Sequence, residues 1–213
     1  LEPSRGMQGQ GIAICPLNLA GITRGKPLNK IGQRPLNQGE IFFDDVHLPK
    51  EYMIMTPRPA LESARRGSGL FSYGGTPMGS MAVMFGGLAR AALDEAIKYA
   101  RHRVQGGVPI IEHKNIKLKL FEMFMMTESA RSLARRLQLY NSMSGASSML
   151  HTMAGKWIAT ETAFKVASEA IQIFGGNGLS KEYVIEKIFR DARAAMIEDG
   201  VNESLALMVA DEL

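Results

Sequence analysis

The feature that most constrains this sequence is a run of apolar residues at helical spacing, which begins at Pro77 and continues to the end of the chain with short interruptions. Apolar residues that recur every three to four positions predict helices that bury one face. The interruptions divide the run into four expected helices, at about residues 77–100, 111–140, 147–174 and 180–198. Because long helices with short connections pack as neighbours, residues 77–213 are predicted to form an antiparallel four-helix bundle.

The same spacing predicts which residues face the core and where the helices end. Phe124 and Leu137 are expected to point inward from the second helix, and Ala154 from the third. The polar run 141–145 should break the second helix. Gly175 should end the third helix, because glycine readily adopts the left-handed conformation found just after helix ends.

The first 76 residues have a different character. Residues 1–50 contain short apolar runs at 11–15 and 40–44, separated by many glycines and prolines. Two strands cannot form a stable sheet alone, so this region is expected to be an incomplete β-domain whose partner strands come from another chain or a preceding region. Residues 51–76 are predicted to be a linker. The fold class is therefore mainly α, a bundle preceded by a short β remnant.

Composition limits the classes of function that the chain can serve. The 213 residues carry a net charge of +4, but the basic residues are dispersed, which disfavours nucleic acid binding. No apolar stretch approaches the ~20 residues that a membrane helix needs. The single cysteine, Cys15, is typical of a reducing compartment such as the cytoplasm. No residues have metal-ligand spacing, so no metal site is expected.

A glycine-dense turn is the first candidate site. Gly175, Gly176 and Gly178 precede the helix expected at Ser180. Such a turn leaves backbone N–H groups free, and a helix N-terminus favours an anion. An ordinary helix stop explains the same glycines.

Charged residues supply two further candidates. In Glu198-Asp199-Gly200 a carboxylate stands at a glycine break, where partial burial suits a general base, although a solvated acidic helix end has the same sequence. Arg103 ends a helix beside a glycine loop, a position that suits phosphate binding or simply the helix dipole. His113 follows that loop and is either a cofactor contact or structural.

In combination and order, these segments resemble the C-terminal half of an acyl-CoA dehydrogenase. The pair formed by Gln172–Gly178 and the later Arg190-Asp-Ala-Arg193 is the most specific part of the resemblance. Segments 25–32 and 41–49 resemble the end of the family's middle β-domain, and residues from 89 onward resemble its C-terminal helical domain.

The resemblance implies an activity, a cofactor and partners. Acyl-CoA dehydrogenases remove a proton from the α-carbon of an acyl-CoA thioester and pass a hydride from the β-carbon to FAD, so the chain is expected to be the C-terminal portion of such an enzyme. The implied partners are an acyl-CoA, an electron-transfer flavoprotein or similar acceptor, and further copies in a homotetramer. The positions that match the family's FAD contacts, which reach a neighbouring subunit's flavin, are Arg103, His113, Gln172, Gly175 and Gly176.

The family's base is usually a glutamate that follows a tyrosine and precedes a glycine. Here Asp199 stands at the glutamate position and Glu198 at the tyrosine position. Asp199 is therefore the expected base, Glu198 the second choice, and Gly200 an expected substrate contact. Aspartate is one methylene shorter, so the substrate lies deeper, a different proton is removed or the activity is lost. Family members with aspartate at this position include enzymes that act on cyclic acyl-CoAs, so the resemblance suggests a cyclic or otherwise unusual acyl group. Four further positions depart from the family's usual residues: Gly106, Lys114, Val201 and Leu205.

These departures leave a second interpretation open, a non-catalytic helical oligomerisation module built on the same fold. A third, an unrelated helical-bundle interaction protein, is disfavoured by the ordered set of motifs. The resemblance leaves out the family's N-terminal helical domain and the first half of its β-domain. The isolated chain is therefore expected to fold with little or no turnover.

Overall fold

The computed structural model describes residues 11–55, 77–144 and 148–213, which divide into two compact units. The first unit contains the described residues up to Lys30 and from Arg34 to residue 55. The second contains Ile31–Gln33 and all described residues from 77 onward. The domain boundaries expected at residues 50 and 76 remain predictions.

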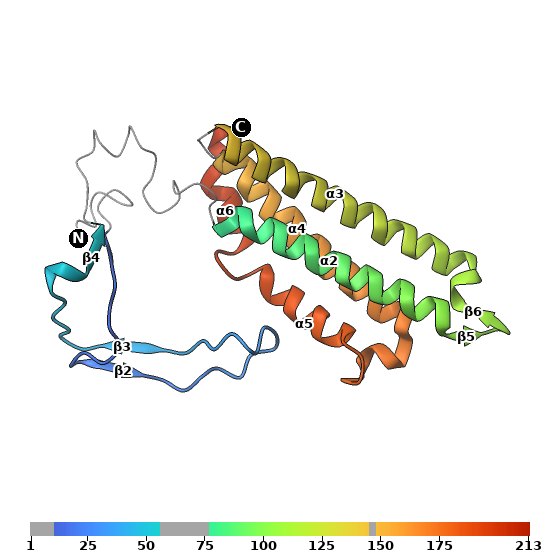
Figure 1. Ribbon diagram of the computed structural model, residues 1–213, viewed down its shortest axis with the longest axis horizontal. Coiled ribbons are helices and arrows are strands. Elements are labelled where there is room, and N and C mark those ends of the chain that lie inside the picture. Colours follow the sequence, from blue (N-terminus) through green and yellow to red (C-terminus); the bar gives the residue numbers. More distant parts are fainter. Residues whose placement is uncertain (1–10, 56–76, 145–147) are drawn as a thin grey trace. The chain divides into compact units, whose positions relative to one another are not determined.

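The second unit is a helical bundle. Its helices are α2 (Pro77–His102), α3 (Lys114–Ser144), α4 (Met149–Phe174), α5 (Ile185–Ala195) and α6 (Asn202–Val209). The colours of Figure 1 show that α2 and α4 run in one direction while α3 and α5 return. A small hairpin of β5 (Val104–Gln105) and β6 (Val108–Pro109) connects α2 to α3, with the 3-10 helix Ile110–Glu112 after it. The predicted mainly helical fold is confirmed.

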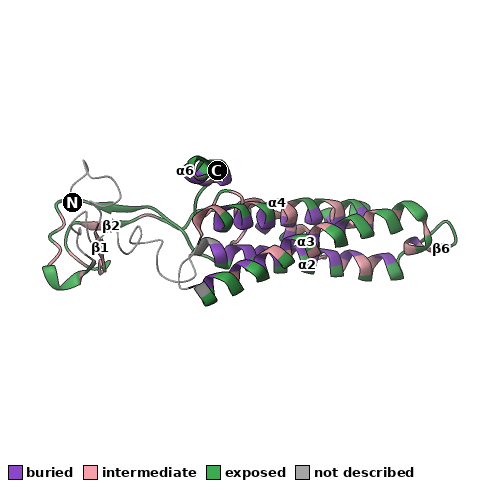
Figure 2. Ribbon diagram, turned by 90° about the horizontal axis from the view of Figure 1, so that it is seen from above, coloured by how far each residue is buried: buried purple, intermediate pink, exposed green. Residues whose placement is uncertain are grey.

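The core of this unit lies around α4, which packs against α2, α3, α5 and α6. Its contact with α2 is built from small residues that are fully buried: Ala82, Ala89, Ala92, Ala96 and Ala100 on α2, and Ala159, Ala163, Ala167 and Ala170 on α4. Figure 2 shows the buried faces of the long helices turned toward one another. Small side chains let the two helix backbones approach closely, so larger residues in this seam would separate them.

Two of the predicted core residues are wrong. Phe124 is 47% exposed, because the buried stripe of α3 passes through the neighbouring Met123 and Thr127, which have no exposed surface. Ala154 is exposed on α4, where the buried positions are its neighbours Met153 and Gly155. In both cases the helix was predicted correctly, but its inner face was displaced by one residue.

The helix ends follow the sequence in part. Gly175 ends α4 with φ +61°, as predicted. The predicted break at 141–145 is wrong for its first four residues, because α3 continues to Ser144 and buries Asn141. The fourth helix is shorter than predicted: α5 begins at Ile185, after a 3-10 helix (Gly175–Leu179) and a turn, and ends at Ala195.

The first unit contains two small antiparallel sheets. In one, β1 (Ile12–Ala13) pairs with β4 (Met53–Met55), and in the other β2 (Ile22–Arg24) pairs with β3 (Ile41–Phe43). The run at 40–44 is therefore confirmed as a strand. The predicted linker contains β4 and, before it, the end of the 3-10 helix Lys50–Tyr52, while its residues 56–76 lie outside the described residues. All three side chains of β3 are exposed. None of the helices in the described ranges combines the length and apolarity needed to cross a membrane.

Candidate functional site

A pocket of about 590 Å³ lies where the end of α2, the β5–β6 hairpin, the start of α3 and the turn after α4 meet. The structure brings together in its wall all five residues that the sequence assigned to a cofactor: Arg103, His113, Gln172, Gly175 and Gly176. Two of these come from the α2–α3 connection and three from the end of α4. The pocket therefore depends on the packing of α2 against α4.

Arg103 supplies positive charge to this pocket. Its backbone is fixed by an N–H that donates to the Tyr99 carbonyl (2.9 Å) and a carbonyl that accepts from the Ile110 N–H (2.8 Å). Its side chain is exposed, and its guanidinium forms no hydrogen bond or ion pair with another residue that the structure describes. An unpaired guanidinium beside a pocket is well suited to bind a phosphate or carboxylate.

His113 packs beneath the hairpin. Its Nε2 lies 3.0 Å from the Gln105 carbonyl oxygen, which holds the imidazole in place. A Cβ added to Gly106, which has φ +64°, would lie 3.3 Å from the His113 ring. Gly106, one of the positions that departs from the family's usual residue, thus lets the hairpin fold closely over the histidine.

The turn after α4 presents open backbone to the pocket. A Cβ added at Gly175 or Gly176 would meet no atom within 4 Å, so a ligand can approach the main chain there. At Gly178, which is buried, an added Cβ would lie 2.8 Å from the Ile171 carbonyl oxygen. The first two glycines therefore leave space for a ligand, and the third is required for packing.

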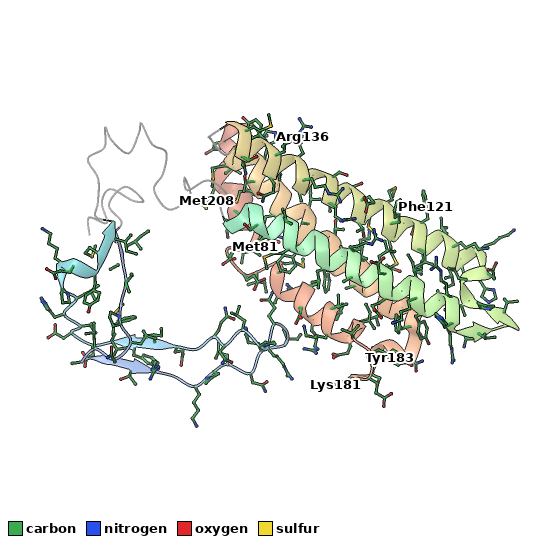
Figure 3. All side chains as sticks on the ribbon, viewed as in Figure 1. Met81, Phe121, Arg136, Lys181, Tyr183 and Met208 are labelled. Atoms are coloured by element: carbon green, nitrogen blue, oxygen red, sulfur yellow. The ribbon has the colours of Figure 1, made fainter. Side chains whose placement is uncertain are left out.

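The sequence analysis missed the residues that hold this turn. The Tyr99 hydroxyl accepts a hydrogen bond from the Asn177 side-chain amide (2.9 Å) and donates one to the Phe174 carbonyl (3.3 Å). The Tyr99 and Phe174 rings stack at 4.0 Å, and Tyr183, labelled in Figure 3, packs edge-on against both. The signal in the sequence that could have identified them is the aromatic residue one helical turn before Arg103.

The acidic turn, Glu198-Asp199-Gly200, is separate from this pocket. Asp199 has φ +50° and is exposed, and Gly200 has φ +104°. A Cβ added to Gly200 would lie 2.8 Å from Cδ2 of Leu205, which is buried, so this turn requires glycine for both its backbone conformation and its packing. The structure therefore does not bring Asp199 and Gly200 together with Arg103.

Glu198 is held by a segment distant in sequence. The Gln33 side-chain amide donates to a Glu198 carboxylate oxygen at 2.5 Å, and the Gln33 backbone N–H donates to Asp191 Oδ1 at 2.5 Å. The Arg190 guanidinium donates to the Ile31 carbonyl at 2.6 Å. Residues 31–33 are thus fastened to α5 and to the acidic turn.

Arg190, which donates to the Ile31 carbonyl, is itself held by an ion pair. Arg190 Nε lies 2.7 Å from a Glu186 carboxylate oxygen. This hydrogen bond lowers the pKa of Glu186 and raises the pKa of Arg190. Both groups therefore stay charged at neutral pH, and Arg190 remains oriented toward the Ile31 carbonyl.

Known proteins resemble this chain in sequence and in fold. A family model for the C-terminal domain of acyl-CoA dehydrogenases matches residues 79–213. The mitochondrial short-chain specific acyl-CoA dehydrogenase of Rattus norvegicus is 33% identical, over 98% of this chain and 50% of its own length. Cyclohexane-1-carbonyl-CoA dehydrogenase of Geobacter metallireducens is 28% identical, over 98% of this chain and 53% of its own. The solved structure of butyryl-CoA dehydrogenase from Megasphaera elsdenii matches with a TM-score of 0.85 and 32% identity, over 99% of this chain and 53% of that one.

The chain spans about half the length of the curated relatives it matches. The family model covers most of the chain, including α2 from residue 79 onward, all of α3 to α6, and the whole pocket that Arg103 lines, called the Arg103 pocket below. The chain belongs to the acyl-CoA dehydrogenase family.

Proposed function

We propose that this chain is the C-terminal part of a flavin-dependent acyl-CoA dehydrogenase, in which the Arg103 pocket binds part of FAD and Asp199 removes the substrate proton. Family membership supports acyl-CoA dehydrogenation as the general activity. The main support from this chain's own residues is that all five expected FAD contacts line one pocket.

The residues present fit the anionic middle of FAD. The Arg103 guanidinium is unpaired within the described part of the chain, and the main chain at Gly175 and Gly176 is open to a ligand. The pocket wall contains Arg103 and no carboxylate, which suits a pyrophosphate. Gln172 and His113 line the same wall and can orient the neighbouring sugar or base by hydrogen bonds. When bound, FAD supplies the acceptor for the substrate hydride.

The acidic turn supplies the proton acceptor. A carboxylate base takes the proton from the α-carbon, which the thioester carbonyl acidifies, while the β-carbon loses a hydride and the α,β double bond forms. Glu198 is engaged by Gln33, whereas Asp199 is exposed and forms no hydrogen bond with another described residue. This difference favours Asp199 over Glu198 as the base. Gly200, next to Asp199, is proposed to contact the substrate.

The two halves of the proposed site lie at opposite ends of α4. Lys156, which contacts Gly200, stands nineteen residues before Gly175 in the sequence. At a rise of 1.5 Å per residue, the two positions are roughly 28 Å apart along the helix. The ribityl chain that joins the pyrophosphate of FAD to its ring is far shorter. One FAD would therefore use Arg103 of one chain and Asp199 of another, which supports self-association. We propose a homotetramer because the family resemblance implies one.

The acyl group and the electron acceptor follow from weaker indications. Asp199 in place of glutamate supports a cyclic acyl group, and the Geobacter relative bears the name of a dehydrogenase for a cyclic acyl-CoA. The proposed acceptor is an electron-transfer flavoprotein or a similar protein. The proposed location is the cytoplasm, based on the single Cys15, whereas the rat relative is named as mitochondrial.

The test uses the complete gene product that encodes this chain, purified with FAD. Its visible absorbance should show bound flavin that is bleached by butyryl-CoA or by cyclohexane-1-carbonyl-CoA under anaerobic conditions. Asp199→Asn should abolish bleaching while the flavin stays bound, and Glu198→Gln should retain it. Bleaching at the wild-type rate by Asp199→Asn would remove that residue from the mechanism.

The pocket is tested separately by cofactor affinity. Arg103→Met should weaken FAD binding by about 10-fold or more, since it removes a charge-assisted contact of about 1.5–3 kcal/mol. Arg101→Met is the matched control, because Arg101 is also exposed near the end of α2 but does not line the pocket. Equal affinities of the two variants would contradict the assignment.

The second candidate, a non-catalytic oligomerisation module, is favoured by an exposed apolar stripe on α3. Leu118, Phe121 and Met125 are each more than half exposed and recur at helical spacing, and Figure 3 labels Phe121 on the outer side of this helix. Such a stripe is typical of a contact with another chain. This candidate predicts a stable oligomer that contains no flavin.

A further inference from the structure

Lys156 is a fully buried lysine in the middle of the bundle, with no exposed surface (0%). Removing an ammonium group from water is costly unless hydrogen-bond acceptors replace the solvent. An apolar side chain of similar volume would fill the same space without this cost. The presence of a lysine at this point of α4 therefore calls for a reason other than packing.

The Lys156 ammonium faces the acidic turn. Its Nζ donates to the Gly200 carbonyl oxygen at 2.6 Å and to Asn202 Oδ1 at 2.9 Å. The Asn202 amide in turn donates to the Thr160 hydroxyl at 3.0 Å, and that hydroxyl donates to the Lys156 carbonyl at 3.0 Å. All three side chains are buried, so they form a closed polar network between α4 and the start of α6.

The turn that this network holds has little local support. Asp199 and Gly200 both have positive φ angles, and a residue other than glycine at positive φ is strained. The residue that caps α6, Val201, makes no side-chain hydrogen bond to the helix. The Gly200 carbonyl accepts its hydrogen bond from Lys156, and the backbone that follows it is held by the bond from the Asn202 N–H to the Met196 carbonyl (3.3 Å).

The charges of nearby acidic residues also attract Lys156 to this turn. Burial lowers the pKa of Lys156, while the charges of Asp199, Glu198 and Glu203 raise it. The acidic residues thus partly offset the cost of burying the ammonium group. An apolar side chain in its place would neither donate to the Gly200 carbonyl nor interact with these charges.

We propose that Lys156 is a positioning residue for the base: by holding the Gly200 carbonyl, it fixes the backbone that carries Asp199. The role in catalysis rests on the proposed function of Asp199. The fixed turn itself is a property of this chain and is tested independently. A displacement of a reacting group by about 1 Å can reduce a rate by about 100-fold, so a loosened turn would slow proton removal.

The test variant is Lys156→Met, which is unbranched and one heavy atom shorter than lysine and has no hydrogen-bond donor. In the complete flavin-containing gene product, the maximal rate of flavin reduction by butyryl-CoA should fall by about 10- to 100-fold, with little change in the concentration of half-saturation. Flavin content should stay the same. Lys165→Met is the matched control on the exposed side of α4 and should retain the wild-type rate.

A purely structural role predicts a different pattern, in which Lys156→Met loses stability and flavin while the protein that stays folded reacts at the normal rate. That result, or a wild-type rate in the stable variant, would overturn the proposal. If Lys156→Met does not fold, the double variant Lys156→Met/Asn202→Leu also removes the Asn202 acceptor and should be less destabilised than Lys156→Met, although the Gly200 carbonyl still lacks its donor. The same loss of rate is expected in it, and a wild-type rate would refute the proposal.

Amide hydrogen exchange in this chain separates failure of the inference from failure of the proposed function. Lys156→Met should accelerate exchange of the Asn202 N–H, whereas the Ile188 N–H, which bonds to the Val184 carbonyl, should be unaffected. Accelerated exchange in a protein that never reduces flavin would reject the dehydrogenase and keep the structural part of the inference. Unchanged exchange at Asn202 would reject the inference whatever the activity.

Discussion

Gly200→Ala should destabilise the bundle by an amount that the structure allows us to work out. At φ +104°, any side chain is strained, at a cost of about 1–3 kcal/mol. The new Cβ would lie 2.8 Å from Cδ2 and 3.0 Å from Cγ of Leu205, which is buried and has to move, at a further cost of about 1–3 kcal/mol. Together these contributions predict a loss of about 2–6 kcal/mol in the free energy of unfolding.

The assay is urea and thermal unfolding of this chain, followed by circular dichroism at the helical band. A loss of this size should lower the Tm by roughly 4–24 °C, at about 2–4 °C per kcal/mol for a chain of this length. Gly87→Ala is the control: Gly87 lies exposed inside α2, and an added Cβ meets nothing within 4 Å. That substitution should stabilise the chain by about 0.5–1 kcal/mol.

Leu205→Ala separates the two costs of the Gly200 substitution. In the double variant, the contact with Leu205 is relieved while the backbone strain remains. The double-mutant cycle should therefore show a favourable coupling of about 1–3 kcal/mol. If Gly200→Ala is as stable as the wild type while Gly87→Ala shows its gain, the reasoning about this turn is wrong.

Two further predictions concern the ends of α4 and α5. Tyr99→Phe should cost about 1–2 kcal/mol in urea unfolding, because it removes the hydroxyl that joins Asn177 to the end of α4 but keeps the stacked ring; an unchanged midpoint would show that these hydrogen bonds contribute nothing. Glu186, whose pKa is lowered by Arg190, should stabilise the fold above its ordinary pKa of 4.5 and lose this contribution as the pH falls through the lowered value. Urea midpoints measured from pH 7 to pH 3 should therefore fall less steeply for Glu186→Gln than for the wild type, and parallel curves would contradict the assignment.

The sequence predicted the helices because their signal is local. Apolar residues at helical spacing mark α2, α3 and α4, and Gly175 marks an end that requires a positive φ. The choice between neighbouring inner faces was less well determined. The run from Met123 to Met126 is apolar throughout, so the pattern alone gave no means of choosing Met123 over Phe124.

The contacts around the acidic turn could not be predicted, because they join segments far apart in sequence. Gln33 reaches Glu198 across more than 160 residues, and no periodicity marks such a pair. Lys156 has the appearance of an ordinary polar residue between Gly155 and Trp157, and only the packing of α4 and α6 reveals its burial. The pocket residues were identified from the family resemblance, because matching a motif assigns each residue by its position in the sequence and needs no knowledge of its contacts.

Because α4 is one continuous helix, it limits where residues can be inserted into or deleted from the chain. Inserting one residue into this helix would move everything beyond it by about 1.5 Å and rotate it by about 100°. Tyr99 would then no longer meet Phe174, and the glycines after α4 would face another direction. Natural gain or loss of residues should therefore be confined to surface connections that line neither site, because α4 serves as a rigid spacer of fixed length between two ends that function apart.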